Sequence, residues 1–453
     1  MNRTHVIIMA LAASSFAATA DAALPERVLH FPTDRSIGSL TSRPARPEEP
    51  TYVPRYWYRD GDWEWLGEAR GDVVVPAGHQ VAFSAGSLRE WRDLSPLLKL
   101  QPDDLYKLSI HGSYTGGSKP GDSCMEYVAH LTGLRALDLE NTNISGAAMK
   151  HVSGMKELLW LTIPGRMDDN GMAFIAELPA LRGLYIKENR ITDAGLAYLP
   201  KLASLEELEL GGGKITDSGL VHLARLPNLK FLLLWGKSFT NDGFRHLKNM
   251  PNIEVLNLGF LLQTTDAGLS HIAEIPQVKE LSFYWAKNIT DEGLSYLKKL
   301  PQLRNLDIGH AKVTDAGMVH LKAIPTLEIL RLPHAGITDK GLQYLSELPR
   351  LRELDVPRTQ YNDPNMDKDG YTDEGLKAMS QCALLEHLSI GGAGITDAGI
   401  RQVARLTRMK SLYISGSARV TDEGLRELAG LRFLEILSIN HCRLTIAGVN
   451  SFS

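Results

Sequence analysis

The chain has 453 residues, a formal net charge of −4 and 23% charged residues. It carries neither a polybasic tract nor an acidic tail, so electrostatic capture of nucleic acid or of an anionic membrane surface is not expected. Its three cysteines, Cys124, Cys382 and Cys442, match no metal-binding or redox spacing, and we expect no structural disulfide.

The N-terminus has the pattern of an export signal. Arg3 and His5 precede an apolar run over residues 6–13, and the segment 20–22 (Ala-Asp-Ala) fits an A-x-A cleavage site. The run is too short to span a bilayer as a helix, and no later run is longer. We expect residues 1–22 to be a signal peptide and the mature chain to reach the periplasm or the extracellular space.

Two segments separate this signal from the rest of the chain. The Pro-rich residues 23–56 predict an extended tether. Residues 57–100 hold four of the seven tryptophans, and alternating apolar residues over 73–83 predict a hairpin. We interpret residues 57–100 as a β-rich N-terminal cap on a repeat domain, because the first layer of a repeat core needs a cover. The alternative for these tryptophans is carbohydrate binding.

Self-similarity dominates residues 101–453. The string I-T-D-x-G-L recurs with its glycines 24 or 25 residues apart, except for one interval of 34, and L-x-x-L-x-L or a variant precedes it. The first apolar residues of the resulting fourteen repeats are Leu105, Leu134, Leu158, Leu181, Leu205, Leu229, Ile253, Val278, Leu303, Leu327, Leu351, Leu385, Met409 and Leu434.

Each repeat predicts a short strand, a turn and a short helix. Leu208 and Leu210 alternate as in a strand, whereas residues 220, 223 and 226 follow helical spacing. Threonines at positions such as Thr314 fit helix N-caps, and the following aspartates place negative charge at the positive end of the helix dipole. For the recurrent glycine we expect close approach of neighbouring repeats.

The pattern L-x-x-L-x-L followed by I-T-D-x-G-L-x-x-L resembles the leucine-rich repeats of bacterial secreted proteins. It is also similar to the cysteine-containing repeats of F-box substrate adaptors, but this sequence has no helical F-box pattern. The resemblance covers residues 101–453 and implies an α/β solenoid: a right-handed horseshoe or arc of about fourteen repeats, with a parallel sheet on its concave face.

Two sets of residues are candidate functional sites. On the concave face, side chains that point away from the core form an aromatic cluster beside a charged strip, as in a binding site with apolar anchors and a polar rim. They are Phe231, Trp235, Phe260, Tyr284, Trp285, Asp307, His310, Arg331, His334, Asp355 and Arg358. The alternative is that these aromatic side chains cover one another.

The second set lies in the 34-residue interval. Its oxygen-bearing residues stand at the alternate positions of a calcium-binding loop, although the bidentate glutamate of such loops is missing. They are Asp363, Asn365, Asp367, Asp369 and Asp373. An ordinary polar surface loop is the favoured interpretation.

No catalytic motif stands out, and repeat solenoids present surfaces rather than pockets. We therefore expect a non-enzymatic scaffold without a cofactor, binding a protein or peptide on its concave face. The runner-up is a glycan-binding module that uses the same aromatic residues.

Overall fold

The computed structural model describes residues 7–9, 24–45, 63–85, 93–111, 119–187, 189–212, 214–357 and 371–452. The chain divides into two compact units. The N-terminal unit comprises residues 16–238 and 249–253, and the C-terminal unit comprises residues 1–15, 239–248 and 254–453. Each unit is described by itself.

The N-terminal unit begins with antiparallel strands and continues into repeats. Its strands are β2 (Arg27–His30), β3 (Ser39–Pro44), β4 (Glu64–Glu68), β5 (Asp72–Val75), β6 (His79–Ser84), β7 (Lys107–Ser109), β8 (Ala136–Asp138), β9 (Trp160–Thr162), β10 (Gly183–Ile186), β11 (Glu207–Gly211) and β12 (Phe231–Trp235). Its helices are α1 (Asp169–Ile175), α2 (Asp193–Leu196) and the 3₁₀ helices η2 (Ser95–Lys99), η3 (Asp122–Tyr127), η4 (Gly146–Val152), η5 (Leu199–Lys201) and η6 (Asp217–Arg225).

The C-terminal unit repeats one strand–helix pattern along its length. Its strands are β1 (Ile7–Met9), β13 (Val255–Gly259), β14 (Glu280–Tyr284), β15 (Asn305–Ile308), β16 (Ile329–Arg331), β17 (Glu353–Val356), β18 (His387–Gly391), β19 (Ser411–Ser415) and β20 (Ile436–Asn440). Its helices are α3 (Asn241–Phe244), α4 (Asp266–Ile272), α5 (Asp291–Tyr296), α6 (Asp315–Leu321), α7 (Asp339–Gln343), α8 (Asp373–Met379), α9 (Asp397–Val403), α10 (Asp422–Glu427), α11 (Ile446–Phe452) and the 3₁₀ helices η7 (Leu247–Asn249), η8 (Leu297–Lys299), η9 (Tyr344–Glu347) and η10 (Leu428–Gly430).

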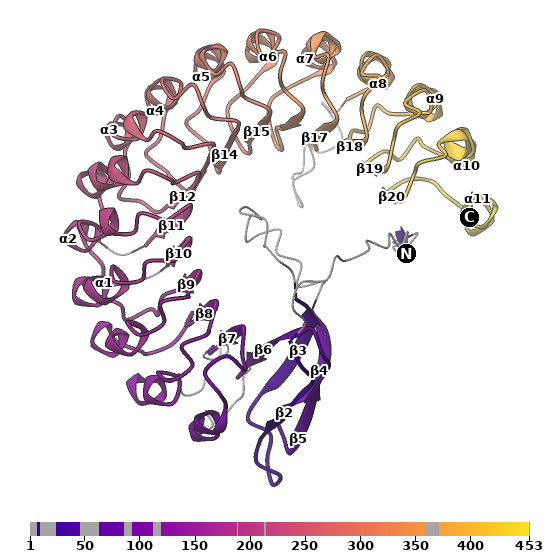
Figure 1. Cartoon of the computed structure of the whole chain (residues 1–453). Helices are drawn as coiled ribbons and strands as arrows, with labels where there is room; N and C mark the ends of the chain where they lie inside the picture. The colour runs from indigo at the N-terminus through magenta and orange to yellow at the C-terminus, as the bar shows by residue number, and fades with distance from the viewer. Residues whose placement is uncertain are drawn as a thin grey trace. The chain divides into compact units, whose positions relative to one another are not determined.

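The predicted repeat pattern is confirmed. Each of the strands β7 to β20 begins two residues after the first apolar residue of its repeat. Within the C-terminal unit β13 to β20 pair in parallel. Figure 1 shows α4 to α10 on one side of β14 to β20. We call the opposite side, which carries no helix, the sheet face.

The N-terminal antiparallel region is confirmed, but it differs in detail from the prediction. Residues 24–45, expected to be a tether, contain β2 and β3, and Leu29, Ile37 and Leu40 are buried there. The hairpin of β5 with β6 is wrong, because β6 already has β3 on one edge and β7 on the other. Strand β5 pairs with β2 instead.

In the C-terminal unit, β1 pairs antiparallel with β20. It lies in the predicted signal peptide, so the expected cleavage would remove this pairing partner of β20.

A threonine–aspartate–glycine contact holds successive repeats together on the helix side. The hydroxyl of Thr314 accepts the N–H of Ala316 and so caps α6, as predicted. The Asp291 carboxylate of the preceding repeat accepts both the Thr314 N–H, at 2.8 Å, and the Thr314 hydroxyl, at 2.6 Å. A Cβ at Gly317 would lie 2.3 Å from Asp291 Oδ1, which explains the recurrent glycine.

Candidate binding site on the sheet face

The strand register places three residues of the predicted charged strip in one row. Asp307, Arg331 and Asp355 are successive partners on β15, β16 and β17. The adjacent row lies two residues earlier along the strands, and it contains Glu280 of β14 and Glu353 of β17. These two glutamates were not among the predicted site residues. We call Glu280, Asp307, Glu353 and Asp355 the acidic strip.

In several repeats a residue shortly after the strand adopts an unusual, left-handed backbone angle. Counted five residues beyond the first strand residue, Phe260, Trp285, His310 and His334 have φ angles of 52°, 65°, 61° and 64°. In the repeat of β19 the same position is Gly416, with a φ of 68°. Residues with a Cβ pay roughly 1–2 kcal/mol in this left-handed region. Four consecutive repeats therefore carry a ring at a position suited to glycine.

These rings contact one another. The imidazole of His310 stacks between the indole of Trp285 and the imidazole of His334, with centroids 4.4 Å away on each side. The Tyr284 ring packs edge-on against the rings of Phe260 and Trp285, with centroid distances of 5.1 Å and 6.2 Å. We call these five residues the aromatic ladder.

The ladder is not closed off by the packing of its members. Phe260 is 51% exposed and Tyr284 is 50% exposed, whereas Trp285, His310 and His334 are partly buried. Within the C-terminal unit the aromatic ladder and the acidic strip lie on neighbouring strands, and part of the ladder's apolar surface faces solvent.

Burial governs the electrostatics of the acidic strip. Burial raises the pKa of Asp307 to about 6 and raises the pKa of Asp355 and Glu280 above the usual range. Arg331 lowers the pKa of all three carboxyls, but it is itself bound to Glu353, with Nη2 and Oε1 2.6 Å apart. Burial also lowers the pKa of His310 and His334, so both rings favour the neutral form.

The predicted residues in the N-terminal unit are arranged differently. Phe231, expected to offer an exposed ring, is only 5% exposed, so that expectation is wrong. Trp235 is partly buried, and its indole N–H donates to Glu209 Oε1 at 3.2 Å. Its ring lies over Gly211, where a Cβ would come 1.8 Å from a ring atom.

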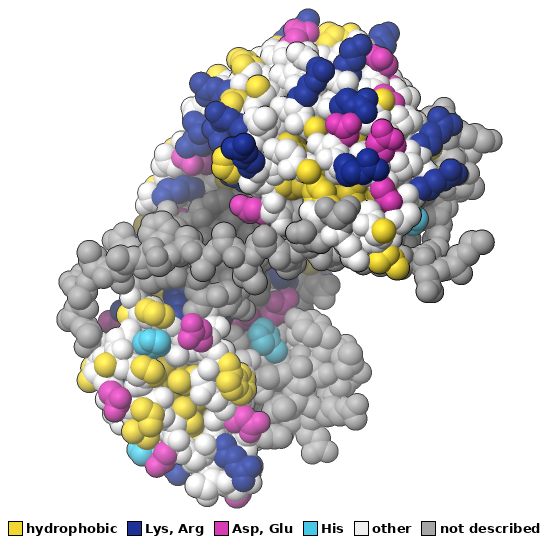
Figure 2. Space-filling view, turned by 90° about the vertical axis from the view of Figure 1, so that its right-hand side faces the viewer, with side chains coloured by type: hydrophobic (Ala, Val, Ile, Leu, Met, Phe, Trp, Pro, Cys, Tyr) yellow, Lys and Arg dark blue, Asp and Glu magenta, His cyan; other side chains and the backbone are white. Residues whose placement is uncertain are grey.

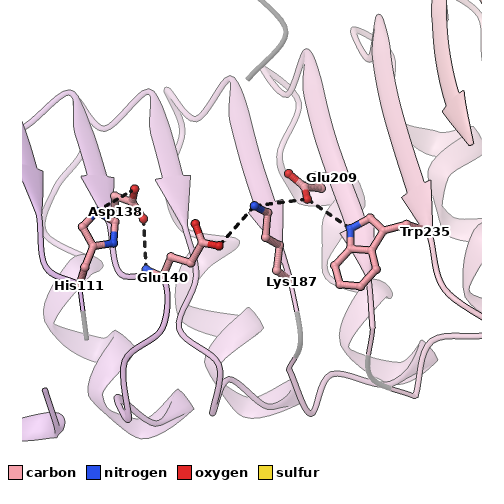
Figure 3. Close-up of polar contacts among 6 residues, drawn as sticks. All are labelled: His111, Asp138, Glu140, Lys187, Glu209 and Trp235. Carbon is pink, nitrogen blue, oxygen red and sulfur yellow. Dashed lines mark hydrogen bonds and ion pairs between the residues drawn. The ribbon is translucent and has the colours of Figure 1, made fainter. Parts of the chain in front are cut away.

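Trp235 thereby joins a polar chain that crosses several repeats (Figure 3). Lys187 Nζ lies 3.3 Å from Glu140 Oε1 and 3.8 Å from Glu209 Oε1, so one ammonium bridges two carboxylates. The Glu140 N–H donates to Asp138, whose carboxylate lies 3.5 Å from His111. These groups pair with one another along this part of the sheet.

The remaining predicted site residues offer less. Arg358, Asp363, Asn365, Asp367 and Asp369 lie outside the described residues. The Asp373 carboxylate serves the contact between repeats: it accepts the N–H and the hydroxyl of Thr396, at 2.8 and 2.6 Å. Within the described ranges no group of three or more His, Cys, Asp or Glu residues could hold a metal ion.

The tryptophans ahead of the repeats are only partly described. The Arg43 guanidinium carbon lies 4.4 Å from the centroid of the Trp63 ring. The ring centroids of Trp63 and Tyr106 are 6.3 Å apart. Trp65 is 66% exposed. Trp57 and Trp91 lie outside the described residues.

Comparison with known proteins agrees with this architecture. A family model described as "Leucine Rich repeat" matches residues 201–224 and 323–346. The two matched segments are leucine-rich repeats. No curated protein matches the chain significantly.

Several solved leucine-rich-repeat structures are similar to the chain. An internalin from Listeria monocytogenes is 23% identical with a TM-score of 0.48, and the match covers 67% of this chain and 80% of the internalin. A leucine-rich-repeat protein from Leptospira interrogans is 15% identical with a TM-score of 0.43, and the match covers 80% and 97% of the two chains.

The third is the ectodomain of the plant receptor kinase GASSHO1/SCHENGEN3 from Arabidopsis thaliana, in complex with CASPARIAN STRIP INTEGRITY FACTOR 2. It is 17% identical with a TM-score of 0.36, and the match covers 80% of this chain but only 44% of that one.

Proposed function

We propose that this leucine-rich-repeat solenoid is an exported, non-enzymatic scaffold that binds a protein or peptide on the sheet face of its C-terminal unit. The observation that carries the proposal is the aromatic ladder. Four consecutive repeats hold a ring at a backbone position suited to glycine, and Phe260 and Tyr284 expose half of their surface. Backbone strain of this kind concentrates at functional sites, and large aromatic side chains dominate protein interfaces.

Export rests on the signal-peptide pattern of residues 1–22. In the described part of the chain no helix is long and apolar enough to cross a membrane. N-terminal sequencing of the protein recovered from the producing cells tests this point. A new N-terminus near Ala23 in the periplasm or the medium supports export, whereas an intact Met1 terminus in the cytoplasm contradicts it.

Binding is tested by selecting a displayed random-peptide library on the mature chain. Selected peptides should lose binding to a Tyr284→Ala or Trp285→Gly variant by about thirtyfold, which corresponds to about 2 kcal/mol for a central interface aromatic. The helix-face variants His222→Ala and His320→Ala should bind normally. Selected peptides that ignore both ladder substitutions would contradict the assignment of the site.

The runner-up function, glycan binding, uses the same rings, because sugar faces stack on exposed aromatic side chains. A panel of purified polysaccharides, tested in parallel with the same variants, separates the two. Ladder-dependent retention on a polysaccharide, combined with a failed peptide selection, would favour the glycan.

A further inference from the structure

The aromatic ladder lies beside a set of carboxylates that outnumber the cations near them in the described part of the chain. The acidic strip holds four carboxyl groups, and the cation that the described residues place among them is Arg331, whose guanidinium is bound to Glu353. Burial raises the pKa of three of the four groups, and the attraction of Arg331 does not offset their desolvation. A positively charged group arriving from outside would stabilise their ionised forms.

This excess of carboxylates is not the pattern on the side of the molecule drawn in Figure 2. On that side, Lys and Arg side chains are interspersed with Asp and Glu. The strip therefore differs from a surface that merely balances its charges.

The ladder itself already accepts a cation. Lys287 Nζ lies 4.5 Å from the centroid of the Trp285 ring, a cation–π geometry. Trp285 also stacks on His310. The electron-rich rings and the neighbouring carboxylates thus favour the same kind of ligand group.

The spacing of the two features fits an extended peptide. Ser282 of β14 stands in the same row as Asp307, Arg331 and Asp355. Tyr284 lies two residues further along β14, so the distance along the strand from this row to Tyr284 is roughly 6.6 Å. Residues i and i+2 of an extended ligand are separated by the same distance and point to the same side. One such side chain can pack on Tyr284 and Phe260 while the next lies over the acidic strip.

We propose that the site takes an extended segment of a partner protein in which an arginine or lysine and an apolar residue stand two positions apart, so that both side chains point to the same side. The cationic side chains lie over Asp307 and Asp355, and the apolar ones pack on the exposed rings of the ladder. This inference rests on the proposed peptide-binding function and adds the chemistry of the partner.

The test uses three labelled octapeptides and the full mature chain. One carries leucine and arginine in turn at every second position, with serine between them, so that both types point to one side. The second replaces arginine with the uncharged isostere citrulline, and the third replaces it with glutamate. Fluorescence anisotropy should give at least about tenfold tighter binding for the arginine peptide than for the citrulline peptide, with the glutamate peptide weakest. Salt should weaken the binding of the arginine peptide selectively.

The double variant Asp307→Asn/Asp355→Asn should lose the tenfold preference for arginine while retaining its thermal stability. The matched control is Glu347→Gln/Glu374→Gln, which removes the same charge from exposed positions on the helix side. It should bind the arginine peptide as the unmodified chain does. Asp307→Ala/Asp355→Ala, which removes the carboxyl groups without adding amide donors, gives a second reading should the asparagine pair unfold the chain.

The outcomes distinguish this inference from the proposed function. If the citrulline or glutamate peptide binds as well as the arginine peptide, and loses binding to Tyr284→Ala, peptide binding stands and the cationic partner is overturned. Undetectable binding of the arginine peptide, or an arginine preference that survives both acidic-strip double variants, also overturns it. Arginine binding that ignores Tyr284→Ala contradicts the proposed site itself.

Discussion

The Asn241 side-chain amide donates to the Thr265 hydroxyl at 2.9 Å, and the Thr265 hydroxyl caps no backbone N–H of α4. In the neighbouring repeat Asp266 takes the place of Asn241 and accepts from the Thr290 hydroxyl at 2.6 Å. Thr290 then uses its lone pair to accept from Glu292 and caps α5. An aspartate at this position accepts from the threonine hydroxyl of the following repeat and leaves that hydroxyl free to cap its helix. An asparagine donates to the hydroxyl instead, and the hydroxyl then does not cap the helix.

The first prediction follows from this pair. Asn241→Asp should let the Thr265 hydroxyl donate to the new carboxylate and accept the N–H of Ala267, its i+2 residue. A gained N-cap stabilises by about 0.5–1 kcal/mol, with a further contribution from charge at the helix N-terminus. Chemical denaturation should register a higher free energy of unfolding. Asn241→Ala should register a lower one, and equal stability of the aspartate and asparagine proteins would refute the explanation.

A second prediction concerns the recurrent glycine. Gly317→Ala should destabilise the chain by about 2 kcal/mol or more, because its Cβ would lie 2.3 Å from Asp291 Oδ1 and force that carboxylate off Thr314. Gly154→Ala is the control, since nothing lies within 4 Å of the added Cβ there.

A double-mutant cycle completes this test. In an Asp291→Ala background the Gly317→Ala substitution should cost much less, because the obstructing carboxylate is gone. Equal costs in the two backgrounds would mean that the glycine serves another purpose.

The repeat architecture was predictable because the buried positions are periodic. Leucines at fixed spacing fix the strand starts, and the threonine–aspartate pair fixes the helix starts. The reason for Gly317 was not predictable in detail, because the obstructing atom belongs to Asp291 of the preceding repeat. Sequence spacing identifies neighbouring repeats but not the rotamer that fills the space between them.

The candidate site was predictable only in part. Alternation along the strands identified Tyr284, Asp307 and Arg331 as sheet-face residues. It did not indicate that Phe231 would be covered. Nor did it reveal the left-handed backbone beneath His310 and His334, since residues of that kind normally favour other angles. The available signal was Gly416 at the equivalent position of a later repeat.

The third prediction uses this backbone angle. At an ordinary position alanine is more stable than glycine, since glycine loses more chain entropy on folding. At Phe260, where φ is 52°, the order should reverse, and Phe260→Gly should be more stable than Phe260→Ala by up to about 1 kcal/mol. Thermal unfolding of the two variants measures the difference.

The two Phe260 variants should differ in stability but not in peptide binding. Both lack the ring and should bind a ladder-dependent peptide equally weakly. If Phe260→Ala were the more stable variant, the backbone strain assigned to the left-handed position of Phe260 would be wrong.

The last prediction concerns Glu207 in the N-terminal unit. Its side chain is 3% exposed, and Oε2 accepts from the Tyr185 hydroxyl at 2.9 Å. Among the residues that the structure describes, Oε1 has no hydrogen-bond partner. Burial raises the pKa of Glu207 from 4.5 to about 7. Because the folded chain binds this proton more tightly than the unfolded chain, Glu207 contributes full stability below about pH 4.5 and loses it as the pH rises through about 7.

The loss amounts to at most about 3 kcal/mol. Glu207→Gln cannot ionise, so the fall in its free energy of unfolding between about pH 5 and about pH 8 should be smaller than that of the unmodified chain by up to that amount. Asp307, whose pKa is also raised by burial, adds to the fall in both proteins and cancels in the comparison. Urea titrations at each pH give the free energy of unfolding of both proteins as a function of pH. The control Glu374→Gln, on the exposed helix side, should show the same pH dependence as the unmodified chain. Parallel pH profiles for Glu207→Gln and the unmodified chain would show that burial does not raise the pKa of Glu207.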